Sequence, residues 1–458
     1  MAERYEIVAT ALLKMLEEKK YAALRDILLV MNPSDIAELF RDLENSQIPL
    51  LFRLLPKNSA AETFVEMESE DQEILIQAFS DNELKQIVDE LYVDDAADLV
   101  EEMPANVVKR ILKQATPEMR ASINQILRYP ENSAGSLMTT EYVSLRPNMT
   151  VEEAILRIRR QGVDKETIYT CYVTDNRTLI GLGSVKDLLL APSDDLRIKD
   201  IMLTSFISVT THTDQEEVAK MFGKYDFLAL PVVDGESRMV GIITFDDAMD
   251  VIEEETTEDI ELMSGMTPSE KPYLKSSPFD LFKNRVPWLI LLMVSATFTG
   301  LIINAFEGAL AAQVALTAFI PMLMGTGGNS GAQSSVTVIR SLSLDELRFS
   351  DIWRVLWKEL RTALLCGIAL AAVCFVKIWL VDYLLFGNEN ITVWVNLTVC
   401  VTLCLTVIIA KVVGGILPLV AKLLKLDPAV MASPFITTIV DALSLLVYFM
   451  VARSLLHI

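Results

Sequence analysis

The sequence is poor in the side chains that bind transition metals or carry out nucleophilic catalysis. It contains two histidines and five cysteines among 458 residues, and no two cysteines have the Cys-x-x-Cys spacing of a metal site. A zinc or copper site built from histidine and cysteine is therefore not expected. A P-loop Gly-x-x-x-x-Gly-Lys and a metalloprotease His-Glu-x-x-His are also missing. These absences argue against an enzyme, and the cysteines are interpreted as small apolar side chains in a reducing compartment.

Long apolar runs are missing before residue 286, and basic residues are scarce there. Of the 62 acidic and 40 basic residues, 9 and 10 lie from Val286 onward, which leaves 53 acids and 30 bases before it and a net charge of −23. Such a surface repels nucleic acid and anionic lipid and attracts cations. The first twenty residues lack the apolar core of a signal peptide, so this region is expected in the cytosol.

What the first region does contain is a helical repeat. The segments IAELFRDL (36–43), AAETFVEM (60–67) and LKQIVDEL (84–91) recur every 24 residues, and AADLVEEM (96–103) adds a copy at half that spacing. Each segment predicts a short amphipathic helix that cannot bury its apolar face alone. Residues 1–130 are therefore predicted to form an acidic, all-α superhelical domain.

A second repeat follows, in which two copies share one order of elements. The stretch GLGSVKD (181–187) of the first copy is matched by GIITFDD (241–247) of the second. Each copy predicts a strand, a helix, two strands and a helix. This order, with Gly-x-x-Ser/Thr-x-x-Asp after the last strand, resembles a tandem pair of CBS domains, an α/β fold. The copies are predicted at 131–200 and 201–245.

The CBS resemblance implies a cleft that can hold ATP or another adenosine nucleotide. In that family the aspartate of the repeated motif contacts the ribose, and the matching residues here are Asp187 and Asp247. The alternative is that both aspartates only cap the helix that follows them.

An unusually acidic stretch leads from this repeat towards the apolar half. FDDAMDVIEEETTEDIE (245–261) holds nine acids in 17 residues and no base. Several acids are three or four residues apart, so a helix would place them on one face, where they repel one another unless something neutralises them. The alternative is an ordinary solvated face. Residues 246–285 are predicted to form an acidic connecting helix and a linker.

Five apolar blocks between residues 286 and 458 are long enough to cross a bilayer, which takes roughly 20 residues. Basic residues cluster in alternate connections, which by the positive-inside rule places the N-terminus in the cytoplasm and the C-terminus outside the plasma membrane. The region is predicted to be a multi-pass transmembrane α bundle of five helices. The blocks are 286–306, 308–339, 362–386, 390–421 and 428–452.

Asp441 is the one charge in the last of these blocks. It lies about 20 Å along a helix from Pro428, near the bilayer midplane. A carboxylate that faces lipid at this depth costs at least about 2.5 kcal/mol. Asp441 is therefore expected to face a water-filled path as a cation site, with Thr437 and Ser433 on the same stripe. The structural alternative is a protonated Asp441 bonded between helices.

The second apolar block contains GTGGNSG (325–331), which predicts an interrupted helix with free carbonyl oxygens beside protein or water. Gly325 and Asn329 therefore join Asp441 as candidates for the pore site. Oxygen ligands suit Mg²⁺, which usually keeps several of its waters. A dehydrated transition metal is disfavoured because no histidine or cysteine accompanies these residues.

The chain resembles the MgtE family of magnesium channels over nearly its whole length. PMLMGTGGNSGAQS (321–334) and LDPAVMASPFITTIVDALSLLVYF (426–449) carry the resemblance most specifically. It implies a homodimer in a lipid bilayer, with a pore at the dimer axis lined by the second and fifth membrane helices. It also implies that Asp441 and the backbone carbonyl of Thr437 select Mg²⁺.

The same resemblance implies a gauge for Mg²⁺ in the cytosolic part. Several ions between acidic faces would favour a compact form, and the connecting helix would then close the pore. The predicted function is a Mg²⁺-selective import channel closed by intracellular Mg²⁺, and the open alternative is a divalent cation carrier coupled to H⁺ or Na⁺. The acids that match the gauge are Glu62, Asp94, Asp98, Asp214, Glu216, Asp226, Asp247, Asp250, Glu254, Glu255, Glu258, Asp259 and Asp427.

Overall fold

The chain divides into two structural units within a single helix, α15 (Phe245–Met263). The units are Met1–Ile252 and Glu253–Ile458. The side chains of Asp164 and Ser433 lie outside the described part of the chain. The computed structural model describes residues 10–16, 18–41, 43–269, 273, 276–387, 391–431 and 433–457.

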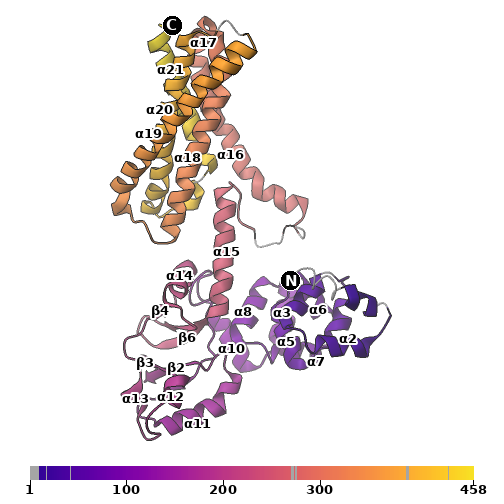
Figure 1. Cartoon of the computed structure of the whole chain (residues 1–458). Coiled ribbons are helices and arrows are strands. Elements are labelled where there is room, and N and C mark those ends of the chain that lie inside the picture. Colours follow the sequence, from indigo (N-terminus) through magenta and orange to yellow (C-terminus); the bar gives the residue numbers. More distant parts are fainter. Residues whose placement is uncertain are drawn as a thin grey trace. The chain divides into compact units, whose positions relative to one another are not determined.

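The helices in the first part of Met1–Ile252 stack side by side (Figure 1). α3, α5, α7 and α9 begin at residues 33, 57, 81 and 105, a spacing of 24, and each contacts the next one of this series. Phe52 belongs to the shared core of these helices. Its ring centroid lies 6.3 Å from that of Phe64 and 5.4 Å from that of Phe79. The predicted helical repeat is confirmed. The helices are α2 (Tyr21–Leu28), α3 (Pro33–Arg41), α4 (Ile48–Phe52), α5 (Lys57–Val65), α6 (Ser69–Ala78), α7 (Asp81–Val88), α8 (Val93–Glu102), α9 (Ala105–Gln114) and α10 (Pro117–Ile126).

Two three-stranded sheets follow, one in each copy of the second repeat. In each sheet the first strand pairs parallel with the second, and the second pairs antiparallel with the third. The predicted order of strand, helix, two strands and helix is confirmed. The elements are β1 (Ser144–Leu145), α11 (Val151–Gln161), β2 (Thr170–Asp175), β3 (Thr178–Ser184), α12 (Val185–Leu189), α13 (Ile198–Ile201), β4 (Val209–Thr210), α14 (Gln215–Tyr225), β5 (Ala229–Val233) and β6 (Met239–Thr244).

The two copies share a buried core. Tyr172 and Leu179 of the first copy pack with Ala229 and Ile242 of the second. The segment before β1 also pairs with β6, because the backbone N–H groups of Thr139 and Ile242 each donate to the other residue's carbonyl, at 2.8 and 2.9 Å. The pair of copies is therefore held together by side-chain packing and by backbone hydrogen bonds.

Long apolar helices dominate Glu253–Ile458. Among the described residues, four segments are long and apolar enough to cross a membrane, namely Pro278–Ala305, Phe349–Leu385, Val393–Leu423 and Pro428–Leu456. A further long helix, α18, is rich in glycine and serine and packs against α20 and α21. The helices are α16 (Pro278–Ala305), α17 (Glu307–Ala312), α18 (Ile320–Ser343), α19 (Ile352–Lys377), α20 (Val393–Leu423) and α21 (Ser433–Leu456), with 3₁₀ turns at Val314–Phe319, Phe349–Asp351 and Pro428–Met431 and a π-helical segment at Ile378–Leu385.

The glycine motif lies inside a continuous helix, which corrects the prediction of an interrupted one. α18 runs through residues 325–331 without a break, and Pro321 lies in its first turn, where a helix needs no backbone donor. The carbonyl groups of the motif are therefore part of a helix rather than left free. Each internal glycine costs roughly 1 kcal/mol relative to alanine, so close packing against neighbouring helices must offset that cost.

Candidate functional site

Asp441 lies on the stretch of α21 that crosses α18. Its Oδ1 atom is buried and accepts no hydrogen bond from the described residues. The neighbouring Val440 packs close to Gly327, and Thr437, one turn earlier, packs close to Gly328. A buried carboxylate oxygen without a donor is uncommon, because its desolvation is then uncompensated. Asp441 is therefore the strongest candidate for an ion-binding group in this unit.

Glycines make the helix crossings close. A Cβ atom at Gly328 would lie 2.8 Å from the Thr437 side chain, and one at Gly414 of α20 would overlap the carbonyl oxygen of Gly331. Gly325 differs, because a Cβ there would meet no atom within 4 Å. Gly328 and Gly331 thus serve packing, whereas Gly325 borders open space.

α18 also has a polar face that its neighbours within the chain leave exposed. Gly325, Asn329 and Gln333 are exposed, and their spacing of four residues places them on one side of the helix. Polar groups that face lipid at membrane depth are costly. This face therefore needs water or a further protein surface. The side chain of Ser433, the remaining predicted pore residue, lies outside the described residues.

Two further charges inside the helical bundle are bridged by a serine. Lys411 of α20 is only 6% exposed. Its Nζ donates to Ser334 Oγ of α18 at 3.4 Å, and that hydroxyl donates to Glu359 Oε2 of α19 at 2.6 Å. This bridge joins three helices. The sequence does not predict this bridge, because its members are far apart in the chain and no periodic pattern connects them.

Carboxylates from three separate segments crowd together in Met1–Ile252. Asp94 of α8 is 6% exposed, and its Oδ1 is buried without a hydrogen-bond partner in the described part of the chain. Burial raises the pKa of Asp94 well above its usual range, and repulsion from Asp247, Asp95 and Glu166 adds to the rise. These four residues and Asp98 are called the acidic cluster below.

The other members of the acidic cluster show the same perturbation. Burial raises the pKa of Asp95 and of Asp98 to about 7, that of Glu166 to about 8 and that of Asp247 to about 6, and repulsion between carboxylates contributes in each case. The Asp98 side chain is open to solvent at its surface, yet the protein around it removes enough water to shift its pKa. A hydrogen bond from the Thr244 hydroxyl opposes the rise at Asp247. Near neutral pH, protons and cations therefore compete for these groups.

The acidic cluster fits a hydrated divalent ion better than a dehydrated one. Within the residues that the structure describes, no three His, Cys, Asp or Glu side chains are arranged to hold a metal ion by direct contact. Mg²⁺ does not require such an arrangement, since it usually retains several waters and takes one or two carboxylates. The orphaned Oδ1 of Asp94 and the raised pKa values are consistent with this kind of binding.

Part of the acidic cluster is predicted by the sequence. Asp94, Asp98 and Asp247 were among the predicted gauge residues, whereas Asp95 and Glu166 were missed. Asp95 could have been found, because it adjoins Asp94 in the sequence. Glu166 follows no repeat and is brought to the cluster only by the tertiary fold.

The predicted gauge acids of α14 are not gathered at one place. Asp214 caps the start of α14 by accepting a hydrogen bond from the N–H of Glu216 at 2.9 Å. Asp226 ends the same helix in the left-handed conformation, with φ of 54°. The length of the helix, roughly 16 Å, separates the two ends. Glu62 is exposed on α5.

The gauge acids predicted beyond residue 249 lie on α15 and in the turn before α21. Asp427 accepts a hydrogen bond from the N–H of Ala429 at 2.7 Å, in the turn that precedes α21. The predicted gauge acids that lie on α15 beyond residue 249 are Asp250, Glu254, Glu255, Glu258 and Asp259.

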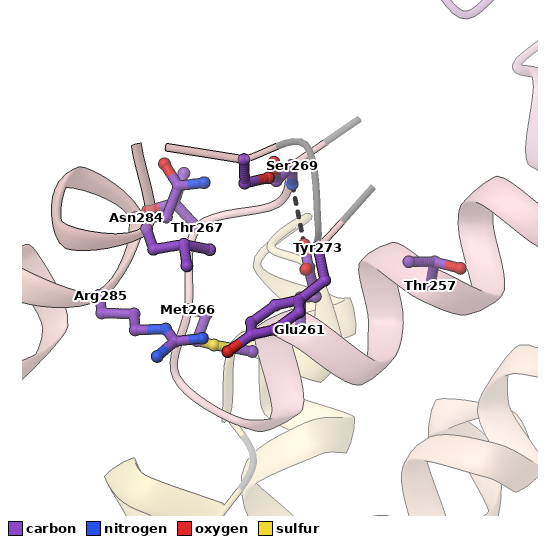
Figure 2. A pocket seen from close by; sticks show the side chains of 10 residues that line it. Thr257, Glu261, Met266, Thr267, Ser269, Tyr273, Asn284 and Arg285 are labelled. Atoms are coloured by element: carbon purple, nitrogen blue, oxygen red, sulfur yellow. Dashed lines mark hydrogen bonds between the residues drawn. The ribbon is translucent and has the colours of Figure 1, made fainter. Parts of the chain in front are cut away.

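Hydrogen bonds in the linker tie the end of α15 to the start of α16 (Figure 2). Glu261 of α15 accepts a hydrogen bond from the N–H of Ser269 at 2.8 Å. The N–H of Thr267 donates to the carbonyl of Asn284 in α16 at 2.9 Å. Glu261, Thr267, Ser269 and Asn284 are among the residues that line a cavity of about 410 Å³. The acidic helix is thereby connected to the first long apolar helix by more than the covalent chain.

The aspartates of the CBS motif make matching contacts at helix starts. Ser184 Oγ donates to Asp187 Oδ2 at 2.6 Å and accepts from the Asp187 N–H at 3.0 Å. The Thr244 hydroxyl donates to Asp247 in the same way. The capping alternative accounts for these contacts, and Asp247 in addition belongs to the acidic cluster.

Comparison with protein families accounts for most of the chain. Residues 320–451 match a family model described as a divalent cation transporter, 31–132 match the MgtE intracellular N domain, and 134–194 and 198–254 match CBS domains. The chain is 40% identical over 342 residues to the magnesium transporter MgtE of Thermus thermophilus, with 74% of each chain covered. The chain belongs to the MgtE family of magnesium transporters. The MgtE of Bacillus subtilis is 37% identical over 341 residues, which cover 73% of this chain and 72% of the relative.

Solved structures of magnesium transporters match about half of the chain. One is the cytosolic domain of the Mg²⁺ channel MgtE in complex with ATP, with 40% identity, a TM-score of 0.51, and 53% of this chain and 99% of the other covered. Another is the soluble part of a magnesium transporter, with 31% identity, a TM-score of 0.50, and 55% and 99% covered. The expected family, helical N-terminal domain, CBS pair and apolar helices are confirmed. The family is one of multi-pass membrane transporters, not of enzymes.

Proposed function

We propose that this MgtE-family member is a Mg²⁺-selective channel that imports Mg²⁺ and is closed by intracellular Mg²⁺. The observation that carries the proposal is the unpartnered Oδ1 of Asp441 at the close crossing of α18 and α21. A buried carboxylate oxygen that has no hydrogen-bond donor among the described residues gains free energy from a cation beside it. The transported ion of the family is Mg²⁺, so Mg²⁺ is the cation expected there.

A single carboxylate suits an ion in transit. Conduction requires binding that is strong enough to admit the ion and weak enough to release it. Mg²⁺ keeps most of its water shell, so one charged group with a few neutral oxygens is sufficient. Thr437, one turn from Asp441, is proposed to add its backbone carbonyl, and Asn329 its amide oxygen.

We further propose that the pore forms between two copies in the plasma membrane. The exposed polar face of α18 supports this, because a second copy would enclose that face around water instead of lipid. The N-terminus would lie in the cytoplasm and the C-terminus outside. The proposed domains are 1–130, 131–200, 201–245, 246–285 and a five-helix pore domain over 286–458.

The acidic region is proposed to act as the gauge. Without bound cations, the carboxylates of the acidic cluster repel one another and favour separation of α8 from the start of α15. Divalent ions held there would screen this repulsion and favour the compact form. α15 continues into Glu253–Ile458, where the linker bonds connect it to α16. Shifting a gate from mostly open to mostly closed takes about 5.5 kcal/mol of differential binding, which several weak sites can share.

An adenosine nucleotide is proposed to bind the CBS cleft beside Asp187 and Asp247. The support is the family's cytosolic domain crystallised with ATP, which is 40% identical to this chain. Helix capping by these aspartates does not exclude a ribose contact, since each carboxylate has a second oxygen.

The deciding experiment measures Mg²⁺ flux and current in liposomes containing wild type or Asp441→Asn protein. We expect the substitution to lower flux at least about 100-fold, which corresponds to losing a charge interaction of roughly 2.7 kcal/mol, and to weaken discrimination against Ca²⁺. Asp345→Asn is the matched control, because Asp345 is 75% exposed in a connection. Near wild-type Mg²⁺ flux in Asp441→Asn would disprove the proposed pore site, and proton movement in fixed ratio to Mg²⁺ would identify a coupled carrier.

A further inference from the structure

A concentration of positive charge stands out in the first CBS copy, within the acidic half of the chain. It surrounds a pocket of about 470 Å³, a volume typical of small-molecule sites. Three of its residues are cationic, and the others offer hydroxyl and amide groups. The lining of this basic pocket consists of Tyr142, Ser144, Arg157, Arg160, Gln161 and Lys165.

The cations of the basic pocket have no counter-charge among the described side chains. Among the described residues, no ion pair engages Arg157, Arg160 or Lys165. The Nε of Arg157 is buried and donates to no acceptor in the described part of the chain. Arg177 adds a further positive charge near Tyr142, where it opposes the rise in the Tyr142 pKa that burial causes. A buried guanidinium donor without an acceptor has free energy to gain from an anion.

Backbone geometry explains how such a pocket persists beside so many acids. The N–H of Glu166 donates to the carbonyl of Glu141 at 3.0 Å, so residues 141–142 and 165–166 run side by side. The carboxylates of Glu141 and Glu166 are close enough to Asp95 to contribute to the raised pKa values of the acidic cluster. Their chain neighbours Tyr142 and Lys165 line the basic pocket instead. Adjacent residues of an extended segment point to opposite sides, which separates the two charge signs.

We propose that the basic pocket binds a phosphate-bearing anion. Arginine offers paired donors that match phosphate oxygens, and lysine adds a point charge. The Ser144 hydroxyl, already 2.9 Å from Thr174 Oγ1, supplies a neutral polar group. The lining includes neither Asp187 nor Asp247, so this site is distinct from the nucleotide cleft proposed above and does not depend on it.

The test titrates inorganic pyrophosphate into the full-length protein in detergent, in Mg²⁺-free buffer, and measures binding by calorimetry. We expect saturable binding that Arg157→Gln and Arg160→Gln each weaken about tenfold or more, because each removes charge-assisted donors. Arg159→Gln is the matched control. Arg159 is exposed on the same helix and lies outside the pocket lining, so its substitution should change affinity less than about twofold.

Three results would overturn the proposal, and the first two concern the basic pocket itself. One is the absence of binding to wild type up to about 10 mM pyrophosphate, a limit equivalent to less than about 3 kcal/mol of affinity. The other is equal weakening by Arg159→Gln, which would indicate only general attraction to helix α11. Loss of binding in Asp187→Asn would place the anion in the nucleotide cleft and also refute the pocket. Should Arg157→Gln unfold, the exposed Arg160 decides the outcome. Competition by inorganic phosphate and by ATP then distinguishes a free phosphate from a nucleotide as the preferred ligand.

Discussion

Buried charges are arranged differently in the two units of this protein. In Met1–Ile252, five carboxylates crowd into the acidic cluster, where burial and repulsion raise their pKa values. In Glu253–Ile458, Lys411 and Glu359 are bridged through Ser334. Asp441, by contrast, has a buried oxygen that no described residue supplies with a donor.

We propose that this difference distinguishes charges that stabilise the fold from charges that bind an ion. A buried charge with a counter-charge and a hydrogen bond can hold helices in register, and removing one partner exposes the cost of burying the other. A buried charge without such a partner lowers stability in the absence of ions, and this cost is recovered only when a cation binds. By this criterion we assign the Lys411–Ser334–Glu359 bridge a structural role and propose Asp441 and the acidic cluster as ion sites.

The largest expected effect on stability comes from breaking the bridge. Glu359→Gln should destabilise the helical bundle by about 3–5 kcal/mol, because it leaves the buried ammonium group of Lys411 without a counter-charge. Adding Lys411→Met should recover most of that loss. The measurement is thermal unfolding of the four proteins of the double-mutant cycle in detergent. Glu346→Gln, at an exposed residue, is the control, and equal unfolding temperatures for the single Glu359 variant and the double variant would refute the coupling.

Neutralising one carboxylate of the acidic cluster should stabilise the protein in the absence of Mg²⁺, in contrast to the effect of breaking the bridge. Asp94→Asn should raise the unfolding temperature in Mg²⁺-free buffer, because it removes a buried, repelled charge. It should also reduce the stabilisation by Mg²⁺, which for one site at 100 times its Kd is about 2.7 kcal/mol. Thermal scans across a Mg²⁺ series measure both. The control is Glu38→Gln, at an exposed residue of α3, which should change neither the unfolding temperature nor its increase with Mg²⁺. If Mg²⁺ stabilises Asp94→Asn as much as wild type, Asp94 is not part of the ion site.

Substituting a packed glycine and an open glycine of α18 should change stability by different amounts, and the larger of these changes is smaller than that for the bridge. Gly331→Val should destabilise the bundle by about 1–3 kcal/mol through overpacking, since any Cβ there meets the Ile436 side chain at 2.7 Å. Gly325→Val should be tolerated in the fold, because that position borders open space. Unfolding temperatures of the two variants give the comparison. Equal destabilisation would mean that both glycines pack against neighbouring helices.

A further expectation concerns the dependence of stability on pH. The folded-state pKa values of about 6 to 8 in the acidic cluster lie above those of unfolded carboxyl groups, near 4. The folded state therefore binds more protons between these limits. This contribution to stability is fully present below about pH 4 and is lost as the pH rises through 6 to 8. In Mg²⁺-free buffer the unfolding temperature should fall between pH 5 and pH 8, and saturating Mg²⁺ should weaken that trend. A rise over this interval would contradict the pKa assignment.

Local patterns predicted much of this fold. The 24-residue recurrence of apolar segments predicted the stacked helices, since each amphipathic helix needs a neighbour to cover it. The repeated Gly-x-x-Ser/Thr-x-x-Asp motif predicted the two α/β copies. The prediction of an interrupted α18 was wrong, because glycine propensity is a local quantity and close packing against α20 and α21 overrides it.

The sequence by itself determined which segments are helical, apolar or acidic, and that one carboxylate lies deep in the last apolar helix. These properties depend on neighbours along the chain. Only the tertiary structure decided which charges have partners. Glu166 joins Asp94, and Lys411 reaches Glu359 through Ser334, because folding brings distant segments together. The role of a buried charge depends on the atoms that surround it in space. Most of these atoms belong to residues far away in the chain, so the local sequence does not predict that role.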